Sequence, residues 1–359
     1  MLIRRLKSSR TKTGLGRAIV IKNDQYLIFL DPQALRKDAL NLISHAHADH
    51  LPTRAEEGAV AYGSEITAAI GALRTKKTIE FRAIDQDLSN IEVSDAGHTV
   101  GSSQYLIRAK EASVLYTGDF CPRKRFFLEG ARPQNCETLI IESTYGSPSY
   151  VFPPIKSVLM RAKDWIEDCF SHSQIPVLIG YSFGKAQLLG AFLEQLSINY
   201  AVHPAIFQIN SNLKRFSLNF KGISLKDSTA KRLFLSEDAA IISPRKLPKQ
   251  YFSADRVMKN RQNGRHPLYS HAHFTGWAIK RPFSRKDSVS FPLSDHADFN
   301  DLLHYIEGCN PERVNVFLYP GSRMARNFAN HVKNRTGIDA ISLEEPSRPQ
   351  RKLADYLDR

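Results

Sequence analysis

The chain has 359 residues, which is long enough for about two domains and for a sizeable hydrophobic core. Its formal net charge of +14 favours a polyanionic partner, although a solvated basic surface would explain the charge as well. The four cysteines form no C-x-x-C pair, and no stretch approaches the ~18 apolar residues of a membrane span. Composition therefore argues against a disulfide scaffold, a cysteine-ligated zinc site and a membrane protein. Because no apolar segment follows the basic N-terminal stretch, the sequence predicts a cytoplasmic protein.

Short β-strands are predicted to dominate the first 150 residues. The candidate segments are rich in β-branched and aromatic residues, and most of them end in a polar residue that is suited to chemistry. The predicted strands cover residues 17–21, 25–31, 41–46, 78–84, 103–109, 113–119 and 137–144.

The pattern changes at Pro154. Residues 155–170 have helical apolar spacing, residues 175–182 form an apolar run typical of a buried strand, and residues 185–196 are again helical. Alternation of strand and helix predicts an α/β insert. After Ser288 the early pattern returns, with predicted strands at 289–298 and 314–322 and predicted helices at 298–308 and 325–334.

These changes predict one domain that is split by an insert. The expected boundaries are 1–150 for its first part, 151–287 for the insert, 288–345 for its second part and 346–359 for a charged, proline-interrupted tail. Lys and Arg far outnumber Asp and Glu between Arg245 and Lys286. Aromatic residues such as Trp277 are interleaved with this basic band, as expected where bases stack beside neutralised phosphates, although core packing explains most of them equally well.

The segment NLISHAHADHLP, residues 41–52, places His45, His47, Asp49 and His50 directly after an apolar run. In H-x-H on a turn that leaves a strand, alternate side chains project the same way. His45 and His47 can therefore share one cation, while Asp49 and His50 reach a neighbouring one. A mixed His/Asp cluster at a strand end is typical of a metal site, and a hydrogen-bonded surface patch is the weaker alternative.

Other strand ends supply further ligands. His98 lies in DAGHTVGS and Asp119 in LYTGDF, and both follow apolar runs. Asp119 can bridge two cations with its two oxygens, and Asp31, which closes YLIFLD, is well placed to hydrogen-bond a ligand imidazole. Taken singly, each could be an ordinary turn residue. Together with HAHADH they indicate a metal centre.

YLIFLD, SHAHADH, AGHTVGS and LYTGDF resemble, in order, the metal-binding motifs of the metallo-β-lactamase fold. IIESTYG (140–146) and PLSDHADF (292–299) resemble the first two signature motifs of the β-CASP nucleases, a branch of that fold that acts on nucleic acids. The resemblance covers nearly the whole chain and weakens over about 190–260 and in the tail. It implies an α/β protein: a metallo-β-lactamase αββα sandwich with an inserted α/β β-CASP domain.

Within this branch, YSFGKAQ, FTGWAIKR and LSDHADFNDLL are similar to ligase-associated DNA exonucleases and also to mRNA 3′-end-processing nucleases. The resemblance implies a cofactor of one or two zinc ions, with manganese or magnesium as alternatives at the second position. It further implies that Glu142 orients His296, which acts as an acid or base near the leaving group, and that Asp49 takes part in catalysis. One implied ligand set is His45, His47, His98 and a bridging Asp119, and the other is Asp49, His50 and Asp119.

One segment departs from the family pattern. RNA-cleaving members carry a histidine after the strand that corresponds to VNVFL, whereas this chain has Pro320 followed by Gly321 and Ser322. Proline cannot ligate a metal, so the second ion is expected to be held more weakly, with more water or substrate oxygen around it. DNA-acting relatives also lack that histidine, which favours DNA as the substrate.

The leading interpretation is a metal-dependent DNA nuclease that works from a 5′ end in DNA repair, with a DNA ligase or helicase as partner. The alternatives are an RNase or RNA 3′-end processor, a non-catalytic nucleic-acid-binding subunit, and a small-molecule hydrolase, which the basic insert argues against. Lys185, Lys280 and Arg281 are expected to contact nucleic acid. Lys185 follows Gly184 at a predicted helix start, where backbone amides also favour phosphate, although a solvated lysine explains it equally well.

Overall fold

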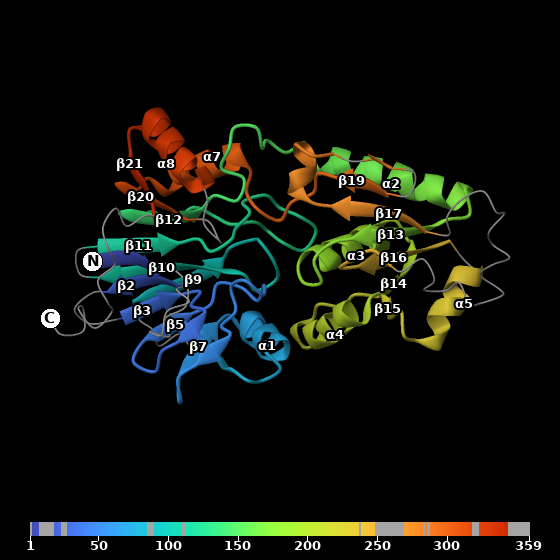
Figure 1. The fold of residues 1–359 in the computed structure, drawn as a ribbon, viewed down its shortest axis with the longest axis horizontal. Coiled ribbons are helices and arrows are strands. Elements are labelled where there is room, and N and C mark those ends of the chain that lie inside the picture. The colour runs from blue at the N-terminus through green and yellow to red at the C-terminus, as the bar shows by residue number, and fades with distance from the viewer. Residues whose placement is uncertain are drawn as a thin grey trace.

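The computed structural model describes residues 2–6, 18–22, 27–84, 90–109, 112–236, 238–247, 269–282, 284–285, 288–317 and 323–343. Two lobes lie next to each other along the long axis of the molecule (Figure 1). The predictions that concern Pro320, Gly321, Ser322 and the tail lie outside the described residues, as does most of the basic band.

The first lobe contains two sheets, each of six strands among the described residues. The first sheet has the order β1-β2-β3-β5-β7-β8, and β3, β5, β7 and β8 are parallel. Its strands are β1 (Leu2–Leu6), β2 (Ala18–Lys22), β3 (Leu27–Leu30), β5 (Leu40–Leu42), β7 (Val60–Gly63) and β8 (Glu80–Ala83). Two short strands, β4 (Ala34–Leu35) and β6 (Arg54–Ala55), pair with each other beside it.

The second sheet has the order β21-β20-β12-β11-β10-β9. Its neighbours from β21 to β11 are parallel, whereas β10 is antiparallel to β11 and to β9. Its strands are β9 (Ile91–Asp95), β10 (Ser103–Ala109), β11 (Ala112–Tyr116), β12 (Thr138–Glu142), β20 (Arg313–Phe317) and β21 (Asp339–Ser342).

A buried apolar layer holds the two sheets face to face. Ile19, Ile28 and Leu42 of the first sheet pack in one cluster with Tyr116 and Ile140 of the second. Helix α1 (Glu65–Arg74) covers the outer face of the first sheet, and α7 (Phe299–Cys309) and α8 (Arg323–Thr336) cover the outer face of the second (Figure 1). This layering confirms the predicted αββα sandwich.

The second lobe is built on a sheet of seven strands among the described residues, with the order β15-β14-β16-β13-β17-β19-β18. Its strands are β13 (Ile175–Ile179), β14 (Asn199–Val202), β15 (Ile223–Ser224), β16 (Ala239–Ser243), β17 (Tyr269–Phe274), β18 (Ser284–Arg285) and β19 (Ser288–Phe291). The helices are α2 (Ile155–Ser171), α3 (Lys185–Gln195), α4 (Pro204–Leu213), η1 (Lys214–Phe216), α5 (Ser228–Ser236) and η2 (Gly276–Ile279). Helices α2 and α3 pack on one face of the sheet and α5 on the other, which confirms the predicted α/β insert.

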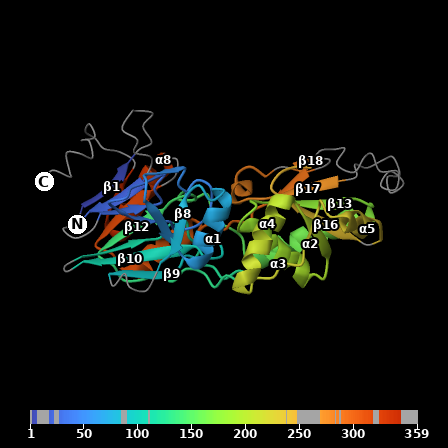
Figure 2. The same ribbon diagram turned by 90° about the horizontal axis from the view of Figure 1, so that it is seen from below.

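The lobes share a further apolar cluster. Ile70 of α1 packs with Ile209 and Leu213 of α4, so the two helices meet where the lobes join (Figure 2). The same cluster contains Phe183, from the loop between β13 and α3. In the part of the chain that the structure describes, no helix is both long and apolar enough to cross a bilayer.

Gly118, between β11 and Asp119, has a positive φ and no room for a Cβ, whereas Gly58 has a positive φ and open space around it. The φ of Gly118 is +55°, and a Cβ there would lie 2.6 Å from the Cβ of Ser44. Gly58 also has a positive φ, +79°, but a Cβ there meets nothing within 4 Å. We expect Gly58→Ala to cost about 1 kcal/mol through its backbone alone, and Gly118→Ala to cost about 1–3 kcal/mol more through overlap. Urea unfolding of both variants measures the difference, and equal losses would contradict the expectation.

Candidate metal centre

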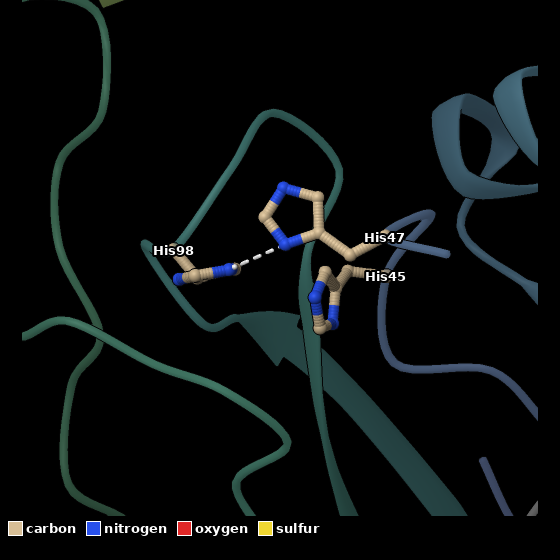
Figure 3. Close-up of side chains that lie close together, drawn as sticks. All are labelled: His45, His47 and His98. Atoms are coloured by element: carbon tan, nitrogen blue, oxygen red, sulfur yellow. Dashed lines mark hydrogen bonds between the residues drawn. The ribbon is translucent and has the colours of Figure 1, made fainter. Parts of the chain in front are cut away.

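Polar side chains from both sheets of the sandwich meet at one edge. His45, His47 and His50 follow β5, Asp119 follows β11, and His98 precedes the antiparallel strand β10, which brings it to the same edge. Figure 3 shows the rings of His45, His47 and His98 gathered around one point. These three histidines can place one nitrogen each within 4.8 Å of one another, a spacing that can hold a metal ion.

Hydrogen bonds fix which nitrogen of each ring is free to bind. His47 donates from Nε2 to the carbonyl of Phe183 at 3.0 Å, and His98 donates from Nδ1 to the carbonyl of Asp295 at 2.9 Å. His45 donates from Nδ1 to Ser44 Oγ at 3.0 Å, because the single hydroxyl proton of Ser44 goes to a carboxylate. In neutral rings the lone pairs therefore lie on His45 Nε2, His47 Nδ1 and His98 Nε2.

These lone pairs fit a cation. His47 Nδ1 and His98 Nε2 face each other at 3.1 Å, and His45 Nε2 is buried without a hydrogen-bond partner (Figure 3). Burial lowers the pKa of all three rings; for His45 and His98, the charges of neighbouring histidines lower it further. The rings therefore stay neutral near pH 7, the form that ligates metal. Three converging acceptors, on the buried rings of His45 and His98 and the partly buried ring of His47, are the chemistry of a metal site.

Asp119 connects this group to two further groups. Its carboxylate can join His45 and His50 around one ion, or His98 and His296 around another. Asp119 Oδ2 lies 3.3 Å from His50 Nε2. Burial acts to raise the pKa of Asp119, but the charges of His50 and His296 outweigh burial and hold it well below its usual range. Asp119 is thus an anion shared by two of the three groups, and its role as a bridging ligand stays a prediction.

Asp31 orients one of these imidazoles, that of His50. Its buried carboxylate accepts hydrogen bonds from the Ser44 backbone N–H and hydroxyl, both at 2.6 Å, and from His50 Nδ1 and the Tyr116 hydroxyl, both at 2.7 Å. The structure thus places Asp31 against a candidate ligand imidazole, as the sequence analysis expected. A hydrogen bond at Nδ1 leaves Nε2 of His50 to face the cluster.

Asp31→Ala is expected to destabilise the protein by several kcal/mol. It would leave four buried donors without their acceptor, and each such loss costs about 1–3 kcal/mol. Urea unfolding in EDTA would measure this effect apart from any bound metal. Asp31→Asn keeps one acceptor oxygen and should fall between wild type and the alanine variant. If Asp31→Ala lowers the free energy of unfolding by less than about 1 kcal/mol, these hydrogen bonds do not have the proposed stabilising role.

Asp49 differs from the expectation in geometry. Its side chain is 62% exposed, and its Oδ2 lies 4.0 Å from His50 Nε2. Asp49 is not part of any of the three groups that can hold a metal among the described residues. It does line the cleft next to the cluster, and its role as a ligand stays a prediction.

Glu142 and His296 form the expected pair. His296 Nδ1 lies 2.9 Å from Glu142 Oε1 and 3.1 Å from Oε2. The backbone N–H groups of Phe120 and Thr144 hold the same carboxylate in place. Burial lowers the pKa of His296, but Glu142 and Asp119 raise it more, to about 9. His296 also lies beside His98, with ring centroids 4.5 Å apart. The Glu142–His296 pair therefore adjoins the group of candidate metal ligands.

Lys185 lies in an internal ion pair. The side chain is 2% exposed, and its Nζ donates to the carbonyl of Leu293 at 2.9 Å and to Asp295 Oδ1 at 3.1 Å. Because the ammonium is enclosed and paired, this geometry does not favour the phosphate contact that was expected. Lys280 and Arg281 are exposed, and Lys280 Nζ lies 4.5 Å above the ring of Tyr150. Contacts of all three with nucleic acid stay predictions.

A cleft of about 680 Å³ opens over the cluster. Sequence reasoning missed several of its residues: Arg74 at the end of α1, Tyr145, Tyr181 and Asp295. Asp295 directly precedes His296 in the motif SDHAD, and this position could have marked it as a residue of the site. Tyr145 lies in IIESTYG and Tyr181 in YSFGKAQ, two segments that carry the family resemblance and so offered a signal, whereas the local pattern around Arg74 marks no site.

Comparisons with known proteins agree with this geometry. Residues 288–343 match the family described as Zn-dependent metallo-hydrolase RNA specificity domain. A probable DNA ligase of Opitutus terrae is 31% identical over 86% of this chain and 29% of the relative. The cleavage and polyadenylation specificity factor subunit 3 of Dictyostelium discoideum is 34% identical over 72% of this chain and 38% of the relative. The 5′ exonuclease Apollo of Rattus norvegicus is 24% identical over 77% of this chain and 50% of the relative.

The chain therefore spans half or less of the length of these relatives. A crystal structure of a protein of unknown function from Enterococcus faecalis V583 has the same fold, with a TM-score of 0.58 at 13% identity over 86% of this chain and 92% of that one. Two packed sheets with outer helices and a His/Asp cluster at one edge define a metallo-β-lactamase fold that carries a metal site. The chain is similar to the β-CASP branch of that fold, as its motifs indicated.

Proposed function

We propose that this chain is a metal-dependent phosphodiesterase that degrades DNA, as an exonuclease working from a 5′ end. The observation that carries the proposal is the convergence of the lone pairs of His45, His47 and His98 beside the Glu142–His296 pair, at the base of an open cleft. The names of two relatives, a probable DNA ligase and a 5′ exonuclease, support DNA and the polarity.

Zinc is the metal that we propose, as one or two ions, with manganese or magnesium as alternatives at the second position. His45, His47 and His98 would hold one ion, and Asp119 with His50 and Asp49 would hold the other. A bound ion would supply an activated water and neutralise phosphate charge. Hydrogen bonds to Phe183 and Asp295 orient two of these rings before any ion binds.

His296 would supply the proton for the departing 3′ oxygen. Its Nδ1 is engaged by Glu142, which leaves Nε2 as the nitrogen that can exchange a proton with substrate. A pKa of about 9 keeps the ring protonated near neutral pH, as an acid requires. Glu142 would hold the ring in place and stabilise its charge.

The inserted domain would cover residues 151–287, between sandwich segments 1–150 and 288–345. The second boundary needs a correction, because β19 (Ser288–Phe291) pairs with β17 in the sheet of the second lobe and so extends the insert through that strand. Because the chain matches part of a probable DNA ligase, we also propose that it works alongside a DNA ligase, with a helicase as the alternative partner.

Cleavage of RNA is the second candidate. The family that matches residues 288–343 is described as an RNA specificity domain, and one relative is a polyadenylation specificity factor subunit. Pro320, where RNA-cleaving members carry a histidine, favours DNA instead.

Matched 5′- and 3′-labelled single-stranded DNA and RNA would test these candidates, with zinc or manganese present. EDTA-treated protein and His45→Ala are the controls. We expect progressive loss of DNA from its 5′ end and little loss of RNA. Preferential cleavage of RNA would replace the DNA proposal with the RNA one. Binding of either polymer without cleavage would instead indicate a non-catalytic subunit.

A further inference from the structure

Two exposed aromatic side chains line the cleft. Among the large hydrophobic side chains that the structure describes as exposed, only Tyr181, at 66%, and Trp277, at 42%, also line the cleft above the His/Asp cluster. Leaving a large ring in water loses the favourable free energy of burial, so exposed rings that gather at one site mark a binding surface.

The two rings adjoin different residues of the cluster. Tyr181 lies in the loop between β13 and α3, and its ring centroid is 5.9 Å from that of His47. Trp277 is the second residue of η2, and its ring lies 4.8 Å from the ring of Tyr145, which in turn lies 5.9 Å from that of His296. One ring therefore adjoins the metal ligands, and the other adjoins the candidate acid through Tyr145.

Trp277 is held in place by its neighbours. The Tyr150 ring meets it edge-on, with centroids 5.4 Å apart and the planes at 90°. Thr275 Oγ1 caps η2 by accepting from the Trp277 backbone N–H at 3.4 Å. A ring that is already fixed loses little entropy when a ligand stacks on it.

Cations stand beside this aromatic group. Lys280 Nζ lies 4.5 Å above the ring of Tyr150, and the charge of the exposed Arg281 opposes the effect of burial on the pKa of that tyrosine. Rings for base stacking next to cations for phosphates are the composition of sites that bind single-stranded nucleic acid.

We propose that Tyr181 and Trp277 stack on unpaired nucleobases on the two sides of the scissile phosphate, so that the substrate is a single-stranded end. A base inside a duplex already stacks on its neighbours and pairs with its partner, so it offers no face to either ring. Every base has a π face, and the site therefore selects strandedness rather than sequence. This inference rests on the proposed function, because it takes the cluster as the place of cleavage.

Binding in EDTA tests the inference without cleavage. Fluorescence anisotropy would compare a labelled oligothymidylate with an oligonucleotide of equal length and charge whose nucleotides are abasic. Wild type should bind the base-bearing strand about 5- to 100-fold more tightly. Trp277→Ala and Tyr181→Ala should each reduce that ratio, and Trp277→Phe should restore part of it. Phe207→Ala is the matched control, because Phe207 is 39% exposed on α4 and does not line the cleft.

Tryptophan fluorescence gives a second readout. The chain has two tryptophans, and Trp165→Phe leaves Trp277 as the sole emitter while keeping an aromatic ring next to Phe291. Base-bearing strands should quench this emission and abasic strands should not. This readout leaves Trp277 in place, so it remains informative if Trp277→Ala fails to fold.

The outcomes separate the inference from the proposed function. If wild type cleaves DNA but binds abasic strands as tightly as base-bearing ones, stacking is refuted and the nuclease stands. If both alanine variants keep the wild-type ratio, stacking by these two rings is refuted. Stacking is supported if the variants lose the preference for base-bearing over abasic strands and if base-bearing strands quench the emission of Trp277. Absence of any oligonucleotide binding together with absence of cleavage refutes both proposals.

Discussion

Asp119→Asn is expected to lower phosphodiester cleavage by about 10³-fold or more and to reduce the amount of bound metal. Asp119 belongs to two of the three groups that can hold an ion, whereas His45, His47 and His98 form a group without it. The variant should therefore keep metal at the three-histidine group and lose it elsewhere. A metal ion contributes several kcal/mol to stabilising charge in the transition state, which corresponds to this loss of rate. Cleavage rates and metal analysis after dialysis measure both effects.

Asp164→Asn is the matched control for this change. Asp164 is an exposed carboxylate on α2, so its replacement changes the net charge by the same amount far from the cluster. It should leave metal content and cleavage unchanged. If Asp119→Asn keeps both full metal content and full activity, then Asp119 is not a ligand and the proposed metal centre is wrong.

The strands and their polar ends were predictable because local sequence determines both. The predicted strands 25–31 and 137–144 correspond to β3 (Leu27–Leu30) and β12 (Thr138–Glu142). Parallel neighbours align their carboxyl ends at one edge, so Asp31 and His45, which follow the parallel neighbours β3 and β5, could be expected to lie close together. Asp119 follows β11 in the other sheet and reaches them through the packing of the two sheets. The strand predicted at 41–46 ends earlier, at Leu42. The reason is that the backbone N–H of Ser44 donates to the side chain of Asp31.

The remainder of the site depends on contacts between residues far apart in the chain. His47 donates to a carbonyl 136 positions away, and Lys185 pairs with Asp295 across 110 positions. Hydrophobic periodicity describes only which face a residue takes within its own element. It therefore could not show that Lys185 is enclosed, that Asp49 points to solvent, or that His296 joins a group with His98 and Asp119. The strand β16 and helices α4 and α5 were also missed, because they lie where the family resemblance weakens.

His296→Ala is expected to slow cleavage by about 10²- to 10⁴-fold at neutral pH, because it removes the proton donor for the leaving oxygen. In metal-free protein, His296 should titrate near pH 9: burial lowers its pKa, but Glu142 and Asp119 raise it more. Glu142→Gln removes the first of these charges, so the titration should move to lower pH. NMR of protein with ¹³C-labelled histidine measures the midpoint. The pH–rate profile should shift in the same direction. As pH rises, the variant should lose activity at a lower pH than wild type does.

Stability gives an independent check on the same pair. A histidine whose pKa is raised on folding stabilises the protein fully below its unfolded pKa of about 6.5, and this contribution disappears as pH rises through about 9. The stability that Glu142→Gln loses relative to wild type should therefore be largest below pH 6.5 and smallest above pH 9. Urea unfolding of metal-free protein across this range measures the difference. Glu307→Gln, an exposed carboxylate on α7, should show no such trend. A pH-independent difference for Glu142→Gln would mean that Glu142 holds Phe120 and Thr144 but does not stabilise a charged His296.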